Sequence, residues 1–520
     1  MLRRWVVALS LFVFPLAIFA DATSLKFDPF VIRTDRTAPV AFTVKYTAPC
    51  ASARIDLNNG SVVTLTTNDG GSTWSGSLTP AQLLYGYAAD DIFRNVFGYL
   101  KSFDASGNPI DNRFLVIGVA ETTTKKVSVA TASAGYRATG YVVNLRLPSL
   151  TSPLSDAAVQ TILSTFYGSF ADSYDFVSVA YALPEYGDNR DHHPTRSDVL
   201  GIGMTPKNDD ALFGSAGKLL GFTRFPLFGY FDGAASAYSH ELGHQWVNFV
   251  QHPLVANAGF HWPPSQMAHF IMGMALPGTS MGGDYPWRYE LQADGTYKFR
   301  WEASRDEFND IDLYLMGFLA PGSVVPQIVL GSPSQTHCDG CTIIGTRTNF
   351  SARDIIATHG SRVPDSTTSQ KSFRVATIVV TRDRLLNDDE MNAYDFFARR
   401  ADGHTALAVS QGLSKATNKP FWLATRGIGS LNSSIVANGN YPTINALRPE
   451  AATAGSQISI VGGPFQTGVN AYFGTTQAQV LWFTTYELRV VVPAIPAGVY
   501  DVRVTQPNGD TLWQQSFTIQ

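Results

Sequence analysis

The pattern of hydrophobic and polar positions divides the chain into three parts, and the first part has a β pattern. Residues 23–120 contain short runs rich in β-branched and aromatic residues, such as 41–46. The turn pairs Asn59-Gly60 and Asp69-Gly70 separate further runs of this kind. Short strands joined by such turns are typical of antiparallel hairpins. We therefore predict an N-terminal Ig-like β-sandwich over residues 23–120.

The middle part, residues 121–437, alternates between strand-like and helix-like patterns. Apolar β-rich runs cover 141–147, 175–180 and 373–381, and 389–399 has the spacing of a helix. After a start signal at Ser155, apolar residues recur at helical spacing: Val159, Ile162, Leu163 and Phe166. Alternating elements of this kind predict a layered α/β (α+β) domain.

The last part, residues 438–520, returns to a β pattern. Val490, Val491 and Val492 belong to one β-branched run, and Asn508-Gly509 separates two others as a strong hairpin signal. We expect a second β-sandwich here, so the fold class is a central α/β domain flanked by two β-sandwich domains.

Three short stretches of this last part carry a resemblance to a known family. Pro442-Thr443-Ile444, Ala454-Gly455 and Tyr500-Asp501-Val502 resemble the IPT/TIG family of immunoglobulin-like domains. Such domains commonly end secreted bacterial proteins. The resemblance implies a spacer or adhesive module, and with it a surface ligand of the C-terminal domain.

The first residues have the pattern of a signal peptide. Arg3-Arg4 precede the apolar run 5–20, and Ala20-Asp21-Ala22 supplies small residues for cleavage. A membrane anchor needs roughly 20 apolar residues, and Pro15 interrupts this shorter run. We therefore expect residues 1–22 to be removed and the mature chain to be secreted, with no membrane span.

Charge and cysteine content narrow the function classes. The chain has 38 Lys and Arg against 42 Asp and Glu, a net charge of −4, and no basic run. Nucleic acid and anionic membranes are therefore not expected as partners. Cys338 and Cys341 are separated by Asp339-Gly340 and are expected to form a local disulfide, whereas Cys50 is expected to be a buried thiol.

The chemistry is concentrated at His240-Glu241-Leu242-Gly243-His244, which has the pattern H-E-x-x-H. Residues four apart on a helix share a face, so His240 and His244 can present ring nitrogens to one ion. Glu241 lies beside them, where it can hold a metal-bound water and take its proton. A surface pair of helix histidines is the alternative. The pattern predicts a Zn²⁺ site, on a helix that begins after Asp232 and continues through 234–250.

A catalytic zinc needs a third protein ligand and an open coordination position. The gluzincin pattern would require a downstream Glu where this chain has Pro263 and Pro264. The metzincin pattern would require Gly at Val247 and His at Val250. Both patterns are excluded, so the third ligand must come from another segment.

Asp312 is one candidate for the third ligand. It lies in an apolar helical segment, where a buried carboxylate needs a partner such as zinc. Asp312, Tyr314 and Gly317 resemble, in content although not in spacing, the Asp, Tyr and Gly of aspzincins such as deuterolysin. The resemblance implies Asp312 as a zinc ligand and Tyr314 as the donor to the oxyanion. The alternative is a helix N-terminus with Asp310 as the cap and Tyr314 in the core.

His261 is the rival candidate. It lies between Phe260 and Trp262 and before two prolines, so a rigid aromatic turn can bring it over the metal or place it as a substrate donor. A loop residue packed beside Trp262 is the alternative. Other candidates rank lower, because their neighbours indicate solvated loops or turns: His252, His269, the pair His192-His193, and Asp284.

The segment 240–317 as a whole resembles uncharacterised secreted bacterial proteins. These proteins contain a His-Glu-x-Gly-His helix, then equivalents of His261-Trp262 and Met281-Gly282-Gly283, and finally of 312–317. The resemblance implies a zincin-type metallopeptidase-like family.

We therefore expect a secreted zinc metalloendopeptidase, a hydrolase that acts on protein or peptide substrates through zinc-bound water, with Glu241 as the general base. The strand around 221–230 is expected to pair with the extended peptide. The second hypothesis is an extracellular adhesin or binding scaffold with a structural or vestigial zinc site. The third is zinc-dependent hydrolysis of a non-peptide bond.

Overall fold

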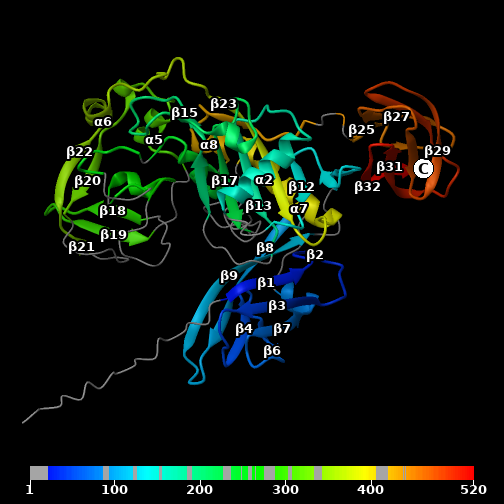
Figure 1. Ribbon diagram of the computed structural model, residues 1–520, viewed down its shortest axis with the longest axis horizontal. Coiled ribbons are helices and arrows are strands. Elements are labelled where there is room, and N and C mark those ends of the chain that lie inside the picture. The colour runs from blue at the N-terminus through cyan, green and yellow to red at the C-terminus, as the bar shows by residue number, and fades with distance from the viewer. Residues whose placement is uncertain are drawn as a thin grey trace, which may run out of the picture.

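The computed structural model describes residues 22–85, 93–120, 126–150, 155–183, 190–226, 236–247, 249–255, 261–263, 265–273, 287–301, 307–332, 342–405, 420–436, 439 and 441–520. Within these ranges the chain is a multidomain, mostly β-sheet protein (Figure 1). The apolar run of the predicted signal peptide, the pair Cys338 and Cys341, and Asp284 lie outside the described residues. None of the described helices is long and apolar enough to cross a bilayer.

Two sheets form the N-terminal part. The first has the strand order β1 (Ala22–Asp28), β3 (Val40–Tyr46), β7 (Thr73–Leu78) and β6 (Thr66–Thr67). The second has the order β2 (Val31–Arg33), β9 (Pro109–Ala120), β8 (Phe93–Phe103), β4 (Ser52–Leu57) and β5 (Val62–Thr64). A short helix, α1 (Pro80–Leu83), follows β7.

Alternation within the strands of this part explains why the two sheets share a core. In β3 the side chains of Val40, Phe42, Val44 and Tyr46 are buried, and those between them are more exposed. Cys50 is a buried free thiol, as predicted.

A mixed sheet forms the centre of the molecule. Its strands follow the order β14 (Asp191–Pro194), β17 (Gly221–Pro226), β13 (Phe176–Tyr181), β23 (Ser372–Thr381), β12 (Val142–Arg146), β11 (Tyr136–Ala138) and β10 (Ser128–Ala132). The four strands from β17 to β12 are parallel, and β14 pairs antiparallel with β17. β14 is therefore the edge strand. The expected pairing of a substrate peptide with the strand around 221–230 is wrong for 221–226, because β17 is paired on both sides, and 227–230 lie outside the described residues.

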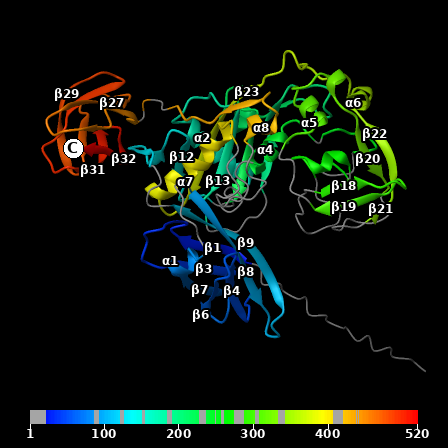
Figure 2. The same ribbon diagram turned by 180° about the vertical axis from the view of Figure 1, so that it is seen from behind.

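Helices cover both faces of this sheet. On one face, α2 (Asp156–Tyr167) begins at the N-cap Ser155 and buries the predicted stripe, Val159, Ile162, Leu163 and Phe166, in one core with Val177 and Ile378. On the other face, α4 (Ser236–Gly243) and α7 (Asp388–Arg399) share a core with Phe176 and Val379. The helix α4, visible in Figure 2, is the one that carries the H-E-x-x-H pattern.

Shorter elements complete the central part. They are β15 (Arg196–Ser197), β16 (Lys207–Asn208), η1 (Asp210–Phe213), η2 (Gln266–His269), β18 (Trp287–Leu291), β19 (Tyr297–Trp301), α5 (Asp310–Leu315), η3 (Pro321–Ser323), β20 (Gln327–Gly331), β21 (Thr342–Ile343), β22 (Thr346–Phe350), α6 (Ala352–His359), η4 (Arg400–Asp402), α8 (Phe421–Ala424) and β24 (Ser430–Asn432). The strands β18 to β22 form a lobe beside the central sheet, green in Figure 1.

The C-terminal part is an Ig-like β domain with its own core. Its strands are β25 (Ile444–Arg448), β26 (Ala451–Ala452), β27 (Gln457–Gly462), β28 (Asn470–Phe473), β29 (Thr476–Phe483), β30 (Glu487–Val491), β31 (Gly498–Gln506) and β32 (Gly509–Ile519). The predicted hairpin at Asn508-Gly509 joins β31 to β32. β32 also pairs with β10, from Ser128 opposite Trp513 to Ala132 opposite Gly509, so one ladder links this domain to the central sheet.

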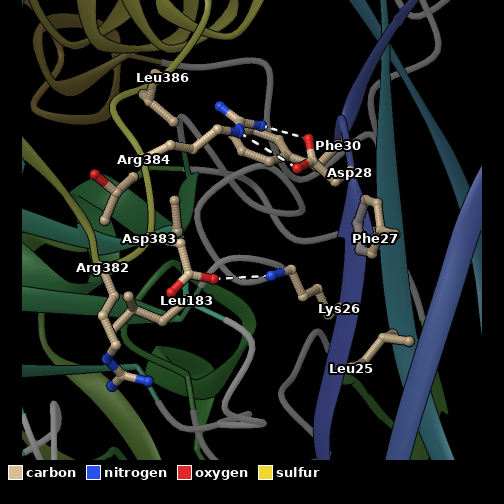
Figure 3. Close-up of a pocket in the computed structure, with 12 residues that line it drawn as sticks. Leu25, Lys26, Phe27, Asp28, Phe30, Leu183, Arg382, Asp383, Arg384 and Leu386 are labelled. Atoms are coloured by element: carbon tan, nitrogen blue, oxygen red, sulfur yellow. Dashed lines mark hydrogen bonds and ion pairs between the residues drawn. The ribbon is translucent and has the colours of Figure 1, made fainter. Parts of the chain in front are cut away.

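Ion pairs join the N-terminal part to the central part. Lys26 pairs with Asp383 at 2.8 Å, and Arg384 pairs with Asp28 at 2.6 Å, across the crevice shown in Figure 3. At the start of α7, Asp389 pairs with Arg33 of the N-terminal part at 3.6 Å and accepts from Lys126 at 2.5 Å. These contacts place the beginning of α7 at the junction of the two parts.

Candidate metal centre

Three histidines from two segments form a compact cluster. His240 and His244 come from α4 and the turn that follows it, and His261 comes from a separate loop. Each ring offers one nitrogen, and the three nitrogens lie within 4.8 Å of one another. The Nε2 atom of His240 is 3.1 Å from Nε2 of His261 and 3.3 Å from Nε2 of His244. The structure thus brings His240, His244 and His261 to one point.

The helix that carries this pattern is shorter than predicted. α4 ends at Gly243, and the chain continues as a tighter turn in which His244, Gln245 and Trp246 donate three residues back. The turn still leaves His244 beside His240, because the change of winding comes only at the helix end. The predicted N-cap, Asp232, lies outside the described residues.

Gly243 allows another segment to approach the helix closely. A Cβ at this position would lie 2.6 Å from Sδ of Met272 and 2.9 Å from the ring of Phe308. Met272 follows Ile271, whose carbonyl oxygen lies 2.5 Å from Nδ1 of His240. The small residue in the H-E-x-x-H pattern therefore lets the Ile271 backbone reach His240.

The charge state of the three rings suits metal binding. Desolvation lowers the pKa of His240 and of His244 well below 6.5, and it lowers the pKa of His261 to about 4. The Ile271 carbonyl accepts the Nδ1 hydrogen of His240, which leaves the lone pair on Nε2 facing the cluster. Neutral imidazoles with converging lone pairs are the donors that Zn²⁺ prefers, so these residues fit the predicted ion.

Asp312 lies outside this cluster, which corrects its prediction as a zinc ligand. Its Oδ1 accepts from Nε1 of Trp262 at 2.6 Å, and its Oδ2 accepts from the backbone N of Asn309 at 3.1 Å and from its Nδ2 at 2.7 Å. Asn309 is the N-cap of α5, and Asp312 completes the capping box. The buried carboxylate is therefore satisfied by hydrogen bonds from protein groups and does not need zinc as a partner. The N-cap of α5 is therefore Asn309, and not Asp310 as the alternative expected.

Tyr314 does not face the cluster either. Residues two apart on a helix point about 200° apart, so the side chain of Tyr314 leaves α5 on the side opposite to that of Asp312. It is buried near Arg362, whose guanidinium binds the carbonyl oxygens of Leu315 and Met316. Tyr314 is therefore a buried core residue, as in the alternative, and the described residues give no support to it as the oxyanion donor.

Glu241 has an unexpected neighbour at the cluster. Nε of Arg190 lies 3.4 Å from Oε1 of Glu241, whose side chain is only 5% exposed. Arg190 is the residue directly before the edge strand β14. The sequence offered one weak signal for it, an arginine two residues before the conspicuous pair His192-His193.

That pair does not form a solvated loop. His192 places Nε2 2.9 Å from Oε1 of Gln245 and Nδ1 3.0 Å from Oγ1 of Thr223, which ties β14 to the turn after α4. His193 stacks on Phe222. Both histidines therefore position the edge strand and do not belong to the cluster.

The remaining low-ranked histidines are also outside the cluster. His252 accepts from the backbone N of Leu254, and His269 ends the short helix η2. Neither belongs to the one group of metal-ligating side chains found among the described residues.

Comparisons with known proteins bear on the domains rather than on the cluster. No curated protein matches the chain. Solved structures with some similarity include two of the full extracellular region of plexin A4, one with domains 1 to 8 and one with domains 1 to 10. Each is 9% identical with a TM-score of 0.16, and each match covers 95% of this chain. The matches cover 48% and 41% of the plexin chains, so this chain spans less than half of their length.

A TM-score this low carries no argument about fold or function. The informative match is a family model, described as the IPT/TIG domain, which covers residues 442–520. It confirms the predicted family of the C-terminal domain: residues 442–520 form an IPT/TIG domain.

Proposed function

We propose that this protein is a secreted zinc-dependent metallopeptidase with a zincin-type central domain. The observation that carries the proposal is the convergence of His240, His244 and His261 beside the carboxylate of Glu241. The basic and apolar start of the sequence supports secretion.

The position of the cluster relative to the sheet supports a peptide substrate. α4 contacts the edge strand β14, and Arg190 links the start of this strand to Glu241. An extended peptide can add to a free sheet edge through main-chain hydrogen bonds. A peptide bound along β14 would therefore lead toward Glu241 and the three histidines.

The chemistry follows from these side chains. When bound, Zn²⁺ would supply a Lewis acid that polarises water and the scissile carbonyl. Glu241 takes a proton from the attacking water while the water oxygen bonds to the carbonyl carbon. The carbon–nitrogen bond then breaks, and Glu241 returns the proton to the leaving amine.

The number of protein donors favours catalysis over a structural site. Among the described residues, three side chains converge, and Asp312 is held by Trp262 and Asn309. Three protein donors leave a fourth position for water or substrate, which is typical of catalytic zinc, whereas structural sites use four.

One observation supports the second candidate function, binding of a surface ligand by the C-terminal domain. Apolar side chains gather where β29 ends, after a register shift between Val480 and Trp482. They are 38 to 72% exposed: Leu481, Trp482, Phe483 and Tyr486. Contiguous exposed apolar side chains mark interaction surfaces. Such binding is compatible with a peptidase, because it uses a different domain.

Metal analysis combined with cleavage tests the proposal. We expect about one Zn²⁺ per chain, loss of proteolysis on a mixture of denatured proteins after treatment with 1,10-phenanthroline, and recovery when zinc is added. A His261→Ala variant should lose both metal and cleavage. Cleavage that resists the chelator would contradict the proposal.

A further inference from the structure

A hydrolytic site needs a donor for the carbonyl oxygen that gains negative charge, and Tyr314 is not in place to supply it. Such donors contribute strongly when they are fixed in advance and shielded from water. Arg190 is the cationic side chain that the described residues bring to Glu241. Its side chain is 22% exposed, so it lies at the rim of the site, where a substrate can reach it.

The guanidinium of Arg190 lies near other groups of the site besides Glu241. Glu241 directly follows His240 in α4, and Nε2 of His240 lies 3.1 Å from Nε2 of His261, so Arg190 lies near the histidine cluster as well. Its position before β14 also puts it on the edge along which a peptide would lie. These relationships place Arg190 beside the proposed general base, close to the histidine cluster and at the start of the proposed path of the substrate.

The movement of charge during hydrolysis makes this position useful. Before the reaction, the negative charge resides on Glu241 and is balanced by Arg190. When Glu241 accepts the proton of water it becomes neutral, and the electron pair of the carbonyl bond moves onto the carbonyl oxygen. The negative charge thus leaves the carboxylate and appears on an oxygen a few ångströms away, still beside the guanidinium.

We propose that Arg190 is a catalytic residue that binds the carbonyl oxygen of the scissile bond as that oxygen becomes an oxyanion. Arg190 keeps its own proton throughout, and its guanidinium exchanges one anionic partner, Glu241, for another. A guanidinium has five N–H donors on three nitrogens, so one group can face both oxygens. This inference rests on the proposed peptidase function and assigns the electrophilic part of its mechanism.

The first test separates kcat from KM on a peptide that the wild-type protein cleaves. We expect Arg190→Ala to lower kcat about 100-fold, the effect of removing one oxyanion donor, and to leave KM within about threefold. Arg190→Lys should recover part of the loss. Arg196→Ala is the matched control, because Arg196 follows the same strand but pairs with Asp198 and contacts Gly217, and it should leave kcat unchanged. Unchanged kcat in Arg190→Ala, or a loss confined to substrates with an acidic residue, would overturn the inference.

The second test does not depend on cleavage. With Co²⁺ in place of zinc, acetate serves as a carboxylate probe for an oxyanion site beside the metal, and the visible absorption of Co²⁺ reports its binding. We expect Arg190→Ala to weaken acetate binding about tenfold while the spectrum without acetate stays unchanged. A changed spectrum without acetate would mean that Arg190 shapes the metal site, and this would overturn the inference.

The two tests fail in different ways. If the wild type cleaves nothing but binds acetate through Arg190, the proposed peptidase function fails and the oxyanion site stands as an anion site. If cleavage and acetate binding are both insensitive to Arg190, the peptidase function stands and the role of Arg190 fails.

Discussion

The indole of Trp262 donates a hydrogen bond of 2.6 Å to the carboxylate of Asp312. Trp262 is 1% exposed and directly follows His261 in the chain. The hydrogen bond therefore anchors the loop that presents His261 to the cluster. Asp312, expected as a metal ligand, instead holds the neighbour of His261.

This relationship predicts that substitutions of Asp312 and of His261 weaken zinc binding to different degrees. Asp312→Ala should weaken zinc binding about 10- to 100-fold, as expected for loss of a group that orients a ligand, and Asp312→Asn should weaken it less because its amide oxygen can still accept from Trp262. His261→Ala should reduce binding further. Competition with a fluorescent chelator measures all three variants. If Asp312→Ala matched His261→Ala and also changed the Co²⁺ spectrum, Asp312 would be a ligand after all.

A side chain added at Gly243 is predicted to disturb the same site by steric crowding. Gly243→Ala would place a methyl group 2.6 Å from Sδ of Met272, the neighbour of Ile271, and 2.9 Å from the ring of Phe308, so these side chains must shift, and we expect the Ile271 carbonyl to move away from His240. We expect a loss of about 1–3 kcal/mol in the free energy of unfolding, together with weaker zinc binding. Gly140→Ala is the control, because nothing lies within 4 Å of its added Cβ. Urea denaturation of both variants measures the difference, and equal midpoints would refute this account of Gly243.

The lowered pKa values predict acid lability of the metal-free protein. His192 and His261 have pKa values of about 4, and His240 and His244 lie well below 6.5. Below pH 6.5 the unfolded chain therefore binds more protons than the folded chain. The contribution of these histidines to the free energy of unfolding is present in full above pH 6.5. It is lost as the pH drops toward 4, by up to about 1.4 kcal/mol per pH unit for each histidine.

Urea midpoints measured between pH 7 and 5 in the presence of EDTA test this dependence. His192→Gln can keep the contacts to Gln245 and Thr223 and should make the dependence shallower by one proton. An equally steep dependence in this variant would show that His192 titrates normally.

The ion pair at the start of α7 predicts an asymmetry between its partners. The side chain of Lys126 is 2% exposed, whereas that of Asp389 is 25% exposed. Asp389→Ala removes the carboxylate beside a buried cation and should lower the free energy of unfolding by about 3 kcal/mol. Lys126→Met leaves a carboxylate that water can reach and should lower it less. Thermal unfolding of both variants and of the double variant measures the difference. The reverse order would contradict this interpretation.

Elements defined by local patterns were predictable from the sequence. The strands 141–147 and 373–381 and the helix after Ser155 appear as β12, β23 and α2, because cap and periodicity are properties of neighbouring residues. The same holds for the hairpin at Asn508-Gly509.

Features that depend on distant segments were not predictable. The choice between His261 and Asp312 depends on a loop docking on α5, fifty positions along the chain. Arg190 reaches Glu241 from a separate strand, and no spacing rule links the two. The strand expected to pair with a substrate peptide lies inside the sheet over 221–226 for the same reason, since pairing order is a property of the whole sheet. The burial of Tyr314 near Arg362 likewise depends on how α5 packs against a distant segment.

The most direct test of the account compares the wild-type protein with Glu241→Gln at equal zinc content. Both proteins are incubated with a mixture of denatured proteins, and new peptide termini are identified by mass spectrometry. Glutamine keeps the shape of the side chain but cannot accept the proton of water. The account predicts new termini with the wild type alone and zinc in both proteins. Equal cleavage by both, or none by a zinc-loaded wild type, would contradict it.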